Sequence, residues 1–395
     1  MLSYSRINKD DYISIFLLIF FSGSPTIFSL GKDYVYSSLL ILILILYKIK
    51  KIEFYKVNVF IMLTFSALIL AHLFLFGSLV IFSSIGFLIQ LLICYILAEK
   101  IKNFPEVYVN IIYFLSILSL VFWGLHNMGV PLMELFSVLK IDLNVELYNI
   151  IIHNFFNDND VNYRNSGVFW EPGAYAGYLN LAFFMLVFNI VKINKHPRKI
   201  LIIIFAIIST FSTTGYVAAS FIIISKFLLR SNMKFISRIL IVIALMPILG
   251  YVAISLDFIG EKITEQLYST ELEADGYQIN RFGNFLYDIN WIEKKPIVGW
   301  GTAPSTRIVI DNNVEELGQG QGNGLTGFAI KFGLVGFFLY FLMCYRSFKC
   351  LGGSKYIGYI SIILIALLLN GEQFLNYPIF LMLMFLKSDD KKFKS

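Results

Sequence analysis

Long runs of apolar residues recur along this chain from Tyr12 to Leu386, and they constrain its fold more than any other feature. A helix of roughly 20 such residues crosses a bilayer core about 30 Å thick. Of all residues, 57% are apolar and 15% are charged, whereas soluble domains carry about 25% charged residues. The sequence therefore predicts an all-α polytopic membrane protein, with residues 1–395 forming a single membrane domain.

Apolar runs alternating with polar breaks predict about twelve transmembrane helices. Their centres lie near Phe20, Ile41, Phe65, Leu88, Leu115, Phe183, Phe205, Ala219, Ala244, Phe338, Ile363 and Leu381. No small-residue cleavage pattern follows the first run, so we expect it to be a retained anchor rather than a signal peptide.

Lysine and arginine gather in alternate breaks, at residues 48–56, 100–102, 192–199, 230–238 and 346–355, and in the C-terminal tail. The positive-inside rule places these segments in the cytoplasm, together with both termini. The remaining breaks carry almost no positive charge and are expected to face outward. The net charge of +6 thus reflects orientation in a membrane rather than binding to nucleic acid.

Two of the outward segments are long, at residues 126–163 and 257–323. Loops longer than about 15 residues are usually functional in a bundle that is otherwise joined by tight turns. The larger loop is expected to contain an amphipathic helix, ended by Pro296 and followed by a bend at Gly299 and Gly301. Its apolar positions are Phe282, Phe285, Leu286, Ile289 and Ile292, and its polar positions on other faces are Asn284, Asp288 and Glu293.

The outward loops carry Arg164, Arg281 and Arg307 in a chain that otherwise uses lysine heavily. Arginine stays charged and presents a planar fork of donors that matches phosphate or carboxylate. An anionic ligand at the outer face is one interpretation of these arginines. Structural ion pairs with the acidic residues of the same loops are the other.

Glu171 stands immediately before Pro172, at the start of an apolar run. Proline suits the first turn of a helix, and the residue before it is pushed away from helical geometry, so Glu171 is expected at the helix cap. The helix N-terminus and Arg164 together would attract an anion. Whether Glu171 accepts a proton in a reaction or only caps the helix is left open by the sequence.

Two other polar side chains are candidates, and one acidic pair is discounted. Lys331 lies inside an apolar run, where a lysine is costly unless it is paired, solvated or snorkelling to the interface. His153 lies in the first long loop and could act as a base if the fold brings it near Arg281; otherwise it is a solvated loop histidine. Asp158 and Asp160 have the spacing of a metal-binding pair, but no nucleotide-binding domain surrounds them, so no metal site and no cofactor are predicted.

Trp170, Trp291 and Trp300 all fall on the predicted outer side. Tryptophan is enriched at membrane interfaces, and it also stacks against sugar rings. Interface anchoring is the favoured interpretation for these three residues.

Three blocks of the sequence resemble the Wzy-type O-antigen polymerases, which share a superfamily and a fold with the O-antigen ligases. The first block is Arg-x-x-Gly-x-Phe-x-Glu-Pro-Gly, from Arg164 to Gly173. The second is RFGNFLYDINWIEKKPIVGWG, which begins at Arg281, and the third is NGLTGFAIKFGLVGFF, which begins at Asn323. The order of the blocks and the placement of the loops also fit, so the resemblance covers nearly the whole chain.

The resemblance implies a GT-C-like glycosyltransferase that works at the periplasmic face of the bacterial inner membrane, without a metal or a nucleotide sugar. Donor and acceptor would both be glycans linked to undecaprenyl diphosphate, and a chain-length regulator is a conceivable partner. Arg164 and Arg281 would clamp the diphosphate, with Arg307 and Lys331 as further contacts and Glu171 as a catalytic residue. Asn323, His153 and Trp170 are secondary candidates.

Two departures from the family pattern affect the interpretation. Ligases carry a histidine just before the asparagine of the third block, where this chain has Gly322. This difference favours a polymerase over a ligase. The family often has an arginine in an outward turn between two middle helices, but here that turn reads STFSTTG, with Thr213 and Thr214 where a charge is expected.

Two alternatives to the polymerase remain. One is transfer of a finished glycan to another acceptor, as a ligase performs it. The other belongs to a different class, a transporter or flippase of lipid-linked sugars. Transporters usually place ion sites near the membrane midplane between two related halves. The charged candidates of this chain instead gather at one face.

Overall fold

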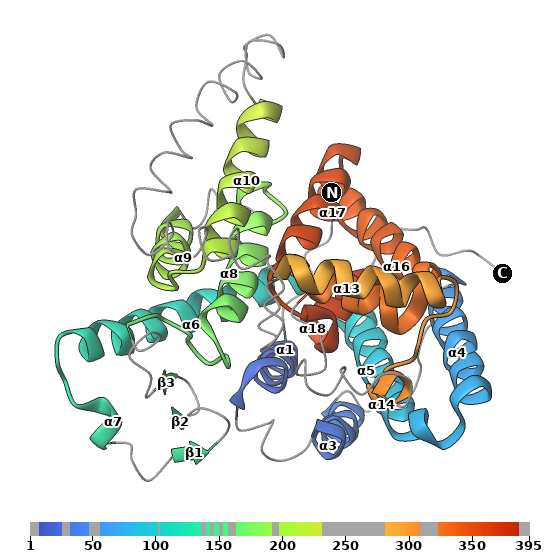
Figure 1. The fold of residues 1–395 in the computed structure, drawn as a ribbon. Helices are drawn as coiled ribbons and strands as arrows, with labels where there is room; N and C mark the ends of the chain where they lie inside the picture. Colours follow the sequence, from blue (N-terminus) through green and yellow to red (C-terminus); the bar gives the residue numbers. More distant parts are fainter. Residues whose placement is uncertain are drawn as a thin grey trace.

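The computed structural model shown in Figure 1 describes residues 8–25, 32–46, 56–101, 103–135, 140–142, 146–149, 153–156, 163–191, 197–230, 281–308 and 323–386. Helices account for most of this part of the chain. They are α1 (Lys9–Gly23), α3 (Lys32–Leu46), α4 (Lys56–Phe76), η1 (Gly77–Val80), α5 (Ile81–Lys100), α6 (Phe104–Asn127), α7 (Leu132–Leu135), α8 (Pro172–Val187), α9 (Pro197–Ser209), α10 (Thr213–Arg230), α13 (Arg281–Lys294), α14 (Ser305–Ile308), α16 (Gly324–Leu351), α17 (Lys355–Gly371), η5 (Phe374–Asn376), α18 (Pro378–Met382) and η6 (Leu383–Phe385).

Local sequence explains where several of these helices begin. Proline stands in the first turn of α6, α8 and α18. The backbone N–H that proline lacks would have no hydrogen-bond partner inside the helix at this position. Asn323 and Ser354 precede α16 and α17, and their side chains accept hydrogen bonds from backbone N–H groups of the first turn. These caps satisfy donors that have no partner inside the helix.

Three helical stretches of the described chain are long and apolar enough to cross a membrane: Lys56–Lys100, Phe104–Asn127 and Gly324–Leu351. Every predicted span centre lies in a helix of the structure except the one near Ala244, which falls outside the described residues. The prediction of a helical membrane protein is confirmed in this coarser form. The twelve-helix count and the GT-C-like arrangement stay predictions.

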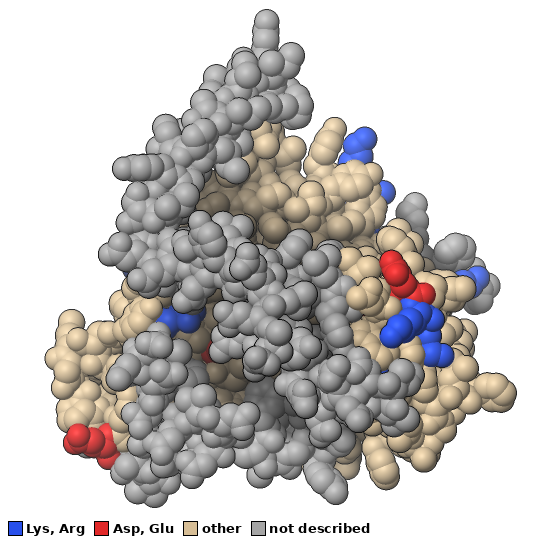
Figure 2. All heavy atoms as spheres, in the orientation of Figure 1, with Lys and Arg blue, Asp and Glu red and all other residues tan. Residues whose placement is uncertain are grey.

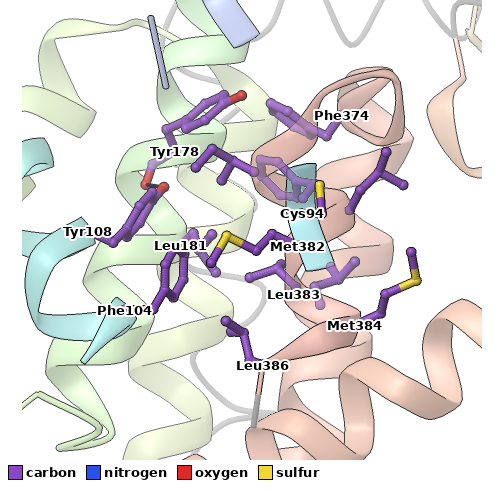
Figure 3. Close-up of a cluster of buried hydrophobic side chains, with 14 of the residues drawn as sticks. Cys94, Phe104, Tyr108, Tyr178, Leu181, Phe374, Met382, Leu383, Met384 and Leu386 are labelled. Atoms are coloured by element: carbon purple, nitrogen blue, oxygen red, sulfur yellow. Dashed lines mark hydrogen bonds between the residues drawn. The ribbon is translucent and has the colours of Figure 1, made fainter. Parts of the chain in front are cut away.

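The segment around Leu381 differs from the span that the sequence predicts. Its two elements, α18 and η6, extend only from Pro378 to Phe385, too short on their own to cross a bilayer core. All of these residues are buried. Figure 3 shows that Met382, Leu383 and Met384 contribute to an apolar cluster near Tyr108 and Tyr178. The high hydropathy of this segment therefore reflects burial in the protein core.

Helix α8 runs through the centre of the bundle, and nearly all of its side chains are buried. Tyr108 of α6 donates a hydrogen bond to the backbone oxygen of Tyr178 at 2.9 Å, and the Tyr178 ring lies 5.4 Å from that of Phe380. Asn180 donates to the backbone oxygens of Ala176 and Gly215, at 2.8 and 3.0 Å. A helix that is apolar all round belongs in the middle of a bundle, so the residues that precede α8 are held at a fixed position.

A small antiparallel sheet, which the sequence did not predict, lies in the first long loop. It consists of β1 (Lys140–Asp142), β2 (Glu146–Asn149) and β3 (Asn154–Phe156), in that spatial order. Strand β3 connects to the loop before α8, because Asn154 N–H donates to Gly167 O at 2.8 Å and the Asn154 side chain donates to Phe169 O at 2.7 Å. The first long loop thus supports the Arg164–Gly173 motif.

Helix α16 breaks at Gly333, whose φ of 63° is not helical. The second long loop occupies the break: Leu334 N–H donates to Pro296 O at 2.7 Å, and Trp300 N–H donates to Ile330 O at 2.8 Å. An ideal Cβ on Gly333 would overlap the backbone of Ile297, so only glycine permits this approach. The second and third sequence blocks are therefore bonded through their backbones.

Trp291 and Trp300 are buried, which corrects the prediction that they anchor the protein at a membrane interface. Their exposed fractions are 1% and 3%, and the two rings meet edge to face with centroids 5.0 Å apart. Trp300 Nε1 donates to the backbone oxygen of Trp291 at 2.8 Å. With Ile330 they form a small core beneath α13, which lies across the first half of α16 in Figure 1.

Candidate functional site

The candidate site lies at one end of the bundle, where α8, α10 and α16 begin and α17 ends. Close contacts between small residues hold these helix ends together. Ideal Cβ atoms would lie 2.7 Å from Ala176 Cβ if built on Gly215, and 2.7 Å from Thr214 Cγ2 if built on Gly371. A Cβ on Gly324 would overlap the backbone oxygen of Glu372. Three helix N-termini therefore point into one region, and each adds partial positive charge.

Charged side chains are rare on the described part of the face in Figure 2, which is mostly neutral. The charged side chains considered at the candidate site come from the loop before α8, from the turn after α17, and from α13, α14 and α16.

Arg164 lies in the loop before α8 and is partly buried. Its Nε donates to the backbone oxygen of Thr210 at 3.2 Å. The next residue, Asn165, donates through its backbone to Ser209 O and through its side chain to Ser209 Oγ, both at 2.9 Å. The arginine from the first block is thus placed on the STFSTTG turn between α9 and α10, the turn in which the sequence lacks the expected charge.

Glu171 is the N-cap residue of α8, as the Glu-Pro pair predicts, with φ −158° and ψ 160°. Its side chain, however, makes no capping hydrogen bond to the helix. The Oε1 atom is buried and has no hydrogen-bond partner among the described residues. The side-chain hydrogen bond through which a capping carboxylate acts is therefore missing, and the helix dipole is the structural role that remains for Glu171.

A second carboxylate, that of Glu372, lies beside Glu171. An ideal Cβ on Gly173 would lie 2.9 Å from Glu372 Oε1 and 3.4 Å from Glu171 Oε1. The two carboxylate oxygens are therefore separated by at most the sum of these distances. Both stand at the N-terminus of α8, where the helix dipole favours negative charge.

Glu372 belongs to residues 370–376, which we call the 370–376 turn and which are one of the weakly charged breaks that the sequence predicts to face outward. The turn touches the start of α8, α10 and α16: Glu372 contacts Gly173 of α8 and Gly324 of α16, and Gly371 contacts Thr214 of α10. Its composition could have revealed it, because Asn370, Glu372, Gln373 and Asn376 form a polar cluster in an apolar chain.

Asn323 caps α16, with its Oδ1 accepting from Leu325 N–H at 2.9 Å and from Thr326 N–H at 3.4 Å. Its amide nitrogen donates to Asn370 Oδ1 at 2.7 Å. Both ends of the Asn323 side chain are thus engaged in structure. The residue fixes the start of α16 against the 370–376 turn.

Lys331 lies two turns into α16, and its ammonium group is hydrogen-bonded to a neutral amide. Its Nζ donates to Asn376 Oδ1 at 2.6 Å, and Asn376 donates in turn to Gln373 Oε1 at 2.7 Å. These three residues line a pocket with Gly324, Gly327, Phe328 and Leu375. We call it the Lys331 pocket; it opens between the start of α16 and the 370–376 turn.

Arg307 and Asp288 lie on the neighbouring elements α14 and α13, with 2% and 0% of their surfaces exposed. The prediction that Asp288 is on a polar face of its helix is wrong. Asp288 Oδ2 accepts a hydrogen bond from the Thr326 hydroxyl, and Oδ1 has no hydrogen-bond partner among the described residues. Burial raises the pKa of Asp288 to about 7, although Thr326, Arg307 and Lys331 each act to lower it.

Arg281 is the first residue of α13. Its side chain is not among those that the structure describes. Trp170 is partly buried, and its ring lies 4.7 Å from that of Tyr377, directly after the 370–376 turn. The predicted pair Asp158 and Asp160 falls outside the described residues.

His153 is not a solvated loop residue, because only 2% of its surface is exposed. Its ring lies 4.7 Å from that of Phe155 and 5.7 Å from that of Phe122. Burial, and to a lesser extent His126, lowers the pKa of His153 to about 3. The imidazole is therefore neutral at physiological pH and a weak base. Its described contacts are aromatic.

Residues 199–341 match the family model for O-antigen ligase. The matched segment contains Arg281, Asp288, Arg307, Asn323 and Lys331, whereas Arg164 and Glu171 precede it. No match to a curated protein was found. The resemblance to the O-antigen polymerase and ligase superfamily is thereby confirmed for the part of the chain that contains its second and third blocks.

Proposed function

We propose that this chain polymerises oligosaccharide units linked to undecaprenyl diphosphate. The match of residues 199–341 to the O-antigen ligase family model supports this proposal. The product would be an O-antigen or a capsular-type polysaccharide. The reaction would take place at the periplasmic face of the bacterial inner membrane. One observation carries this proposal: within the described part of the chain, the buried Oε1 of Glu171 has no hydrogen-bond partner, and Glu171 stands at a convergence of helix N-termini.

The charge pattern of the helix ends supports the proposed side. Arg198 and Lys199 lie in the first turn of α9, Arg230 ends α10, and Lys349 is in the last turn of α16. Each of these basic residues lies at the end of its helix that is farther from the candidate site. By the positive-inside rule, this pattern supports an outer-side position for the candidate site.

The proposed reaction transfers a glycan from its lipid carrier to a sugar hydroxyl. The hydroxyl oxygen of the acceptor attacks the anomeric carbon of the donor, and the bond from that carbon to the diphosphate oxygen breaks. The undecaprenyl diphosphate leaves with the electron pair, and Glu171 accepts the proton of the hydroxyl. In a polymerase the donor is the growing chain and the acceptor is a new lipid-linked unit.

Basic groups at the same end of the bundle would stabilise the departing diphosphate. Arg164 is hydrogen-bonded to the turn between α9 and α10, and Lys331 lines the pocket beside the 370–376 turn. Arg307 and Arg281 lie on elements that pack near α16. Fixed positive groups aimed at a developing anion are usually the largest single contribution to such catalysis.

Several features bear on the alternatives. The matched family model is described as an O-antigen ligase, so ligation remains the second candidate. Polymerisation is favoured because the ligase histidine is replaced by Gly322 and because a pair of carboxylates, Glu171 and Glu372, could receive the proton instead. Transport is disfavoured because the charged candidates gather at one end of the helices rather than midway along them.

The test is product length from purified protein supplied with one lipid-linked repeat unit. A ladder of products supports polymerisation, and a single transfer that requires a separate acceptor supports ligation. Absence of any covalent product contradicts both and leaves transport. Arg164→Ala and Arg281→Ala should abolish long products while the protein stays folded in the membrane.

A further inference from the structure

Asn165 is a buried polar residue to which the proposed reaction assigns no role. It follows Arg164 in the loop before α8, and none of its surface is exposed. A buried side-chain amide is costly unless its donors and its acceptor find hydrogen-bond partners. The partners of Asn165 therefore show which parts of the structure this residue holds together.

The donors of Asn165 tie the loop to two helices that pack against each other, α6 and α9. Its Nδ2 donates to Ser119 Oγ of α6 at 3.1 Å and to Ser209 Oγ at the end of α9 at 2.9 Å. Its backbone N–H donates to Ser209 O, also at 2.9 Å. The loop is thus fixed to both helices by the side chain and to α9 by the backbone as well.

The acceptor of Asn165 shapes the chain as it turns toward α8. Oδ1 accepts from the N–H of Gly167 at 3.0 Å, a local turn that asparagine side chains form readily. Gly167 has a φ of 55°, a backbone conformation that other residue types seldom adopt. The one amide therefore sets both the attachment of the loop and the direction in which it leaves.

The two serines accept from Asn165 because their own protons are directed elsewhere. Ser119 Oγ donates to the backbone oxygen of Ser116 at 3.0 Å. Ser209 Oγ donates to that of Ala206 at 2.9 Å. The site thus requires a side chain with two N–H donors for the serines and one acceptor for the turn. An asparagine amide supplies all three, whereas an aspartate carboxylate supplies no donor.

The same attachment determines the position of Arg164. Arg164 Nε donates to Thr210 O at 3.2 Å, and Thr210 directly follows Ser209, the residue that Asn165 holds. Adjacent loop residues are therefore bonded to adjacent residues at the end of α9. Without the Asn165 amide, the loop would lose its bonds to both serine hydroxyls, and the guanidinium would be free to shift with it. A shift of about 1 Å in a catalytic site can cost a factor of about 100 in rate.

We infer that Asn165 is a positioning residue for Arg164: by bonding to α6 and α9, it holds the guanidinium where it stabilises the departing diphosphate. This inference rests on the proposed function for the role of Arg164. The structural alternative is that Asn165 contributes only to stability. Asn110 illustrates such a role, because it joins α6 to α1 and α9 near the opposite end of α6, through Tyr12 and Lys199.

The experiment measures steady-state elongation by purified full-length protein in liposomes supplied with one lipid-linked repeat unit. The kcat is expressed per folded molecule, at a temperature well below the melting temperature of every variant. Asn165→Ala should lose about 10-fold to 100-fold of kcat. Its KM should change much less, because the bonds of Arg164 to the leaving group strengthen as negative charge develops there. Asn110→Ala is the matched control, and it should lower the melting temperature while keeping the wild-type kcat.

The pH profile of kcat separates an effect on Arg164 from an effect on Glu171. A guanidinium stays charged throughout the accessible pH range. The profile of Asn165→Ala should therefore have the wild-type shape at a lower level. A profile displaced along the pH axis would place the effect at Glu171 and overturn the inference.

A second pair of variants tests the same attachment from α6. Ser119 and Ser116 are both fully buried on α6, and both lie within hydrogen-bond distance of Tyr175 OH, at 2.8 and 3.5 Å. The bond from Asn165 goes to Ser119. Ser119→Ala should lower kcat by about 2-fold to 10-fold, because one hydrogen bond is removed, and Ser116→Ala should keep the wild-type kcat. This pair decides the question even if Asn165→Ala does not fold.

A wild-type kcat in Asn165→Ala, or equal losses in Asn165→Ala and Asn110→Ala, would overturn the inference. Equal effects of Ser119→Ala and Ser116→Ala would do the same. A product ladder from wild type in those experiments would leave the proposed function intact. If wild type formed no glycan product, the proposed function would fall, and the role assigned to Asn165 would fall with it.

Discussion

Replacement of Gly324 by alanine is expected to displace the start of α16 from the 370–376 turn. The new Cβ would overlap Glu372 O and would approach Gln373 Cα and Glu372 C to 2.7 and 2.8 Å. These are backbone atoms, so no side-chain rotation can relieve the contact. Ordinary contact begins at 3.4 Å, and the two segments must therefore separate by about 0.7 Å or more. A misplacement of about 1 Å in a catalytic site can cost a factor of about 100 in rate.

The assay is the rate of glycan-chain elongation by membranes that contain equal amounts of each variant. Gly324→Ala should lose between about 10-fold and 100-fold of this rate. Gly124→Ala is the matched control, because a Cβ on Gly124 meets nothing within 4 Å and alanine favours the helix α6 in which it lies. Wild-type elongation by Gly324→Ala would refute the reasoning that the 370–376 turn is part of the site.

Further outcomes are expected at four positions, each with its own readout. Arg164→Lys should recover little of the elongation rate that Arg164→Ala loses, because an ammonium cannot reproduce the planar guanidinium fork. Equal elongation rates for Arg164→Lys and wild type would contradict this. Glu171→Gln should reduce elongation by a factor of about 100 or more if Glu171 is the general base, and Glu372→Gln should reduce it less; the reverse order would move the proton acceptor to Glu372. The pKa of Asp288 is raised to about 7 by burial, so its contribution to folding stability is present at low pH and is lost as the pH rises through 7. Asp288→Asn should therefore gain stability relative to wild type by about 1.4 kcal/mol between pH 6 and pH 8, and a thermal-shift difference that does not change with pH would argue against this.

Hydropathy, together with the proline and glycine residues that start and end helices, predicted a large part of the fold. The Glu-Pro pair at Glu171 and Pro172 marked the start of α8, and Pro296 with Gly299 and Gly301 marked the end of α13 and the bend after it. These signals are local, because they depend on the backbone preferences of single residues. They therefore do not require knowledge of the tertiary structure.

Predictions failed where tertiary contacts decided the outcome. Trp291 and Trp300 have the composition of an interface belt, yet they pack on each other because the loop descends onto the break at Gly333. Asp288 has the spacing of a polar face, yet it is buried against Thr326. Sequence periodicity says which residues share a face, but it does not say what covers that face.

The candidate site was predicted in part, for a similar reason. Arg164 and Glu171 were found from their unusual residue types beside an apolar run, and both lie at the convergence of helix ends. Glu372 and Asn376 were missed because their importance comes from the helices they touch, which are distant in sequence. Residues 370–376 stand out in the sequence only as a polar cluster, and a polar cluster does not indicate which helices it contacts.

The most direct test of the account is to count the lipid diphosphate released for each glycosidic bond formed. Purified protein in liposomes would receive a single lipid-linked repeat unit, and free undecaprenyl diphosphate would be quantified beside the product ladder. The account predicts one undecaprenyl diphosphate per added unit in wild type and neither product in Arg164→Ala. Release of the diphosphate without chain growth, or chain growth in Arg164→Ala at the wild-type rate, would contradict it.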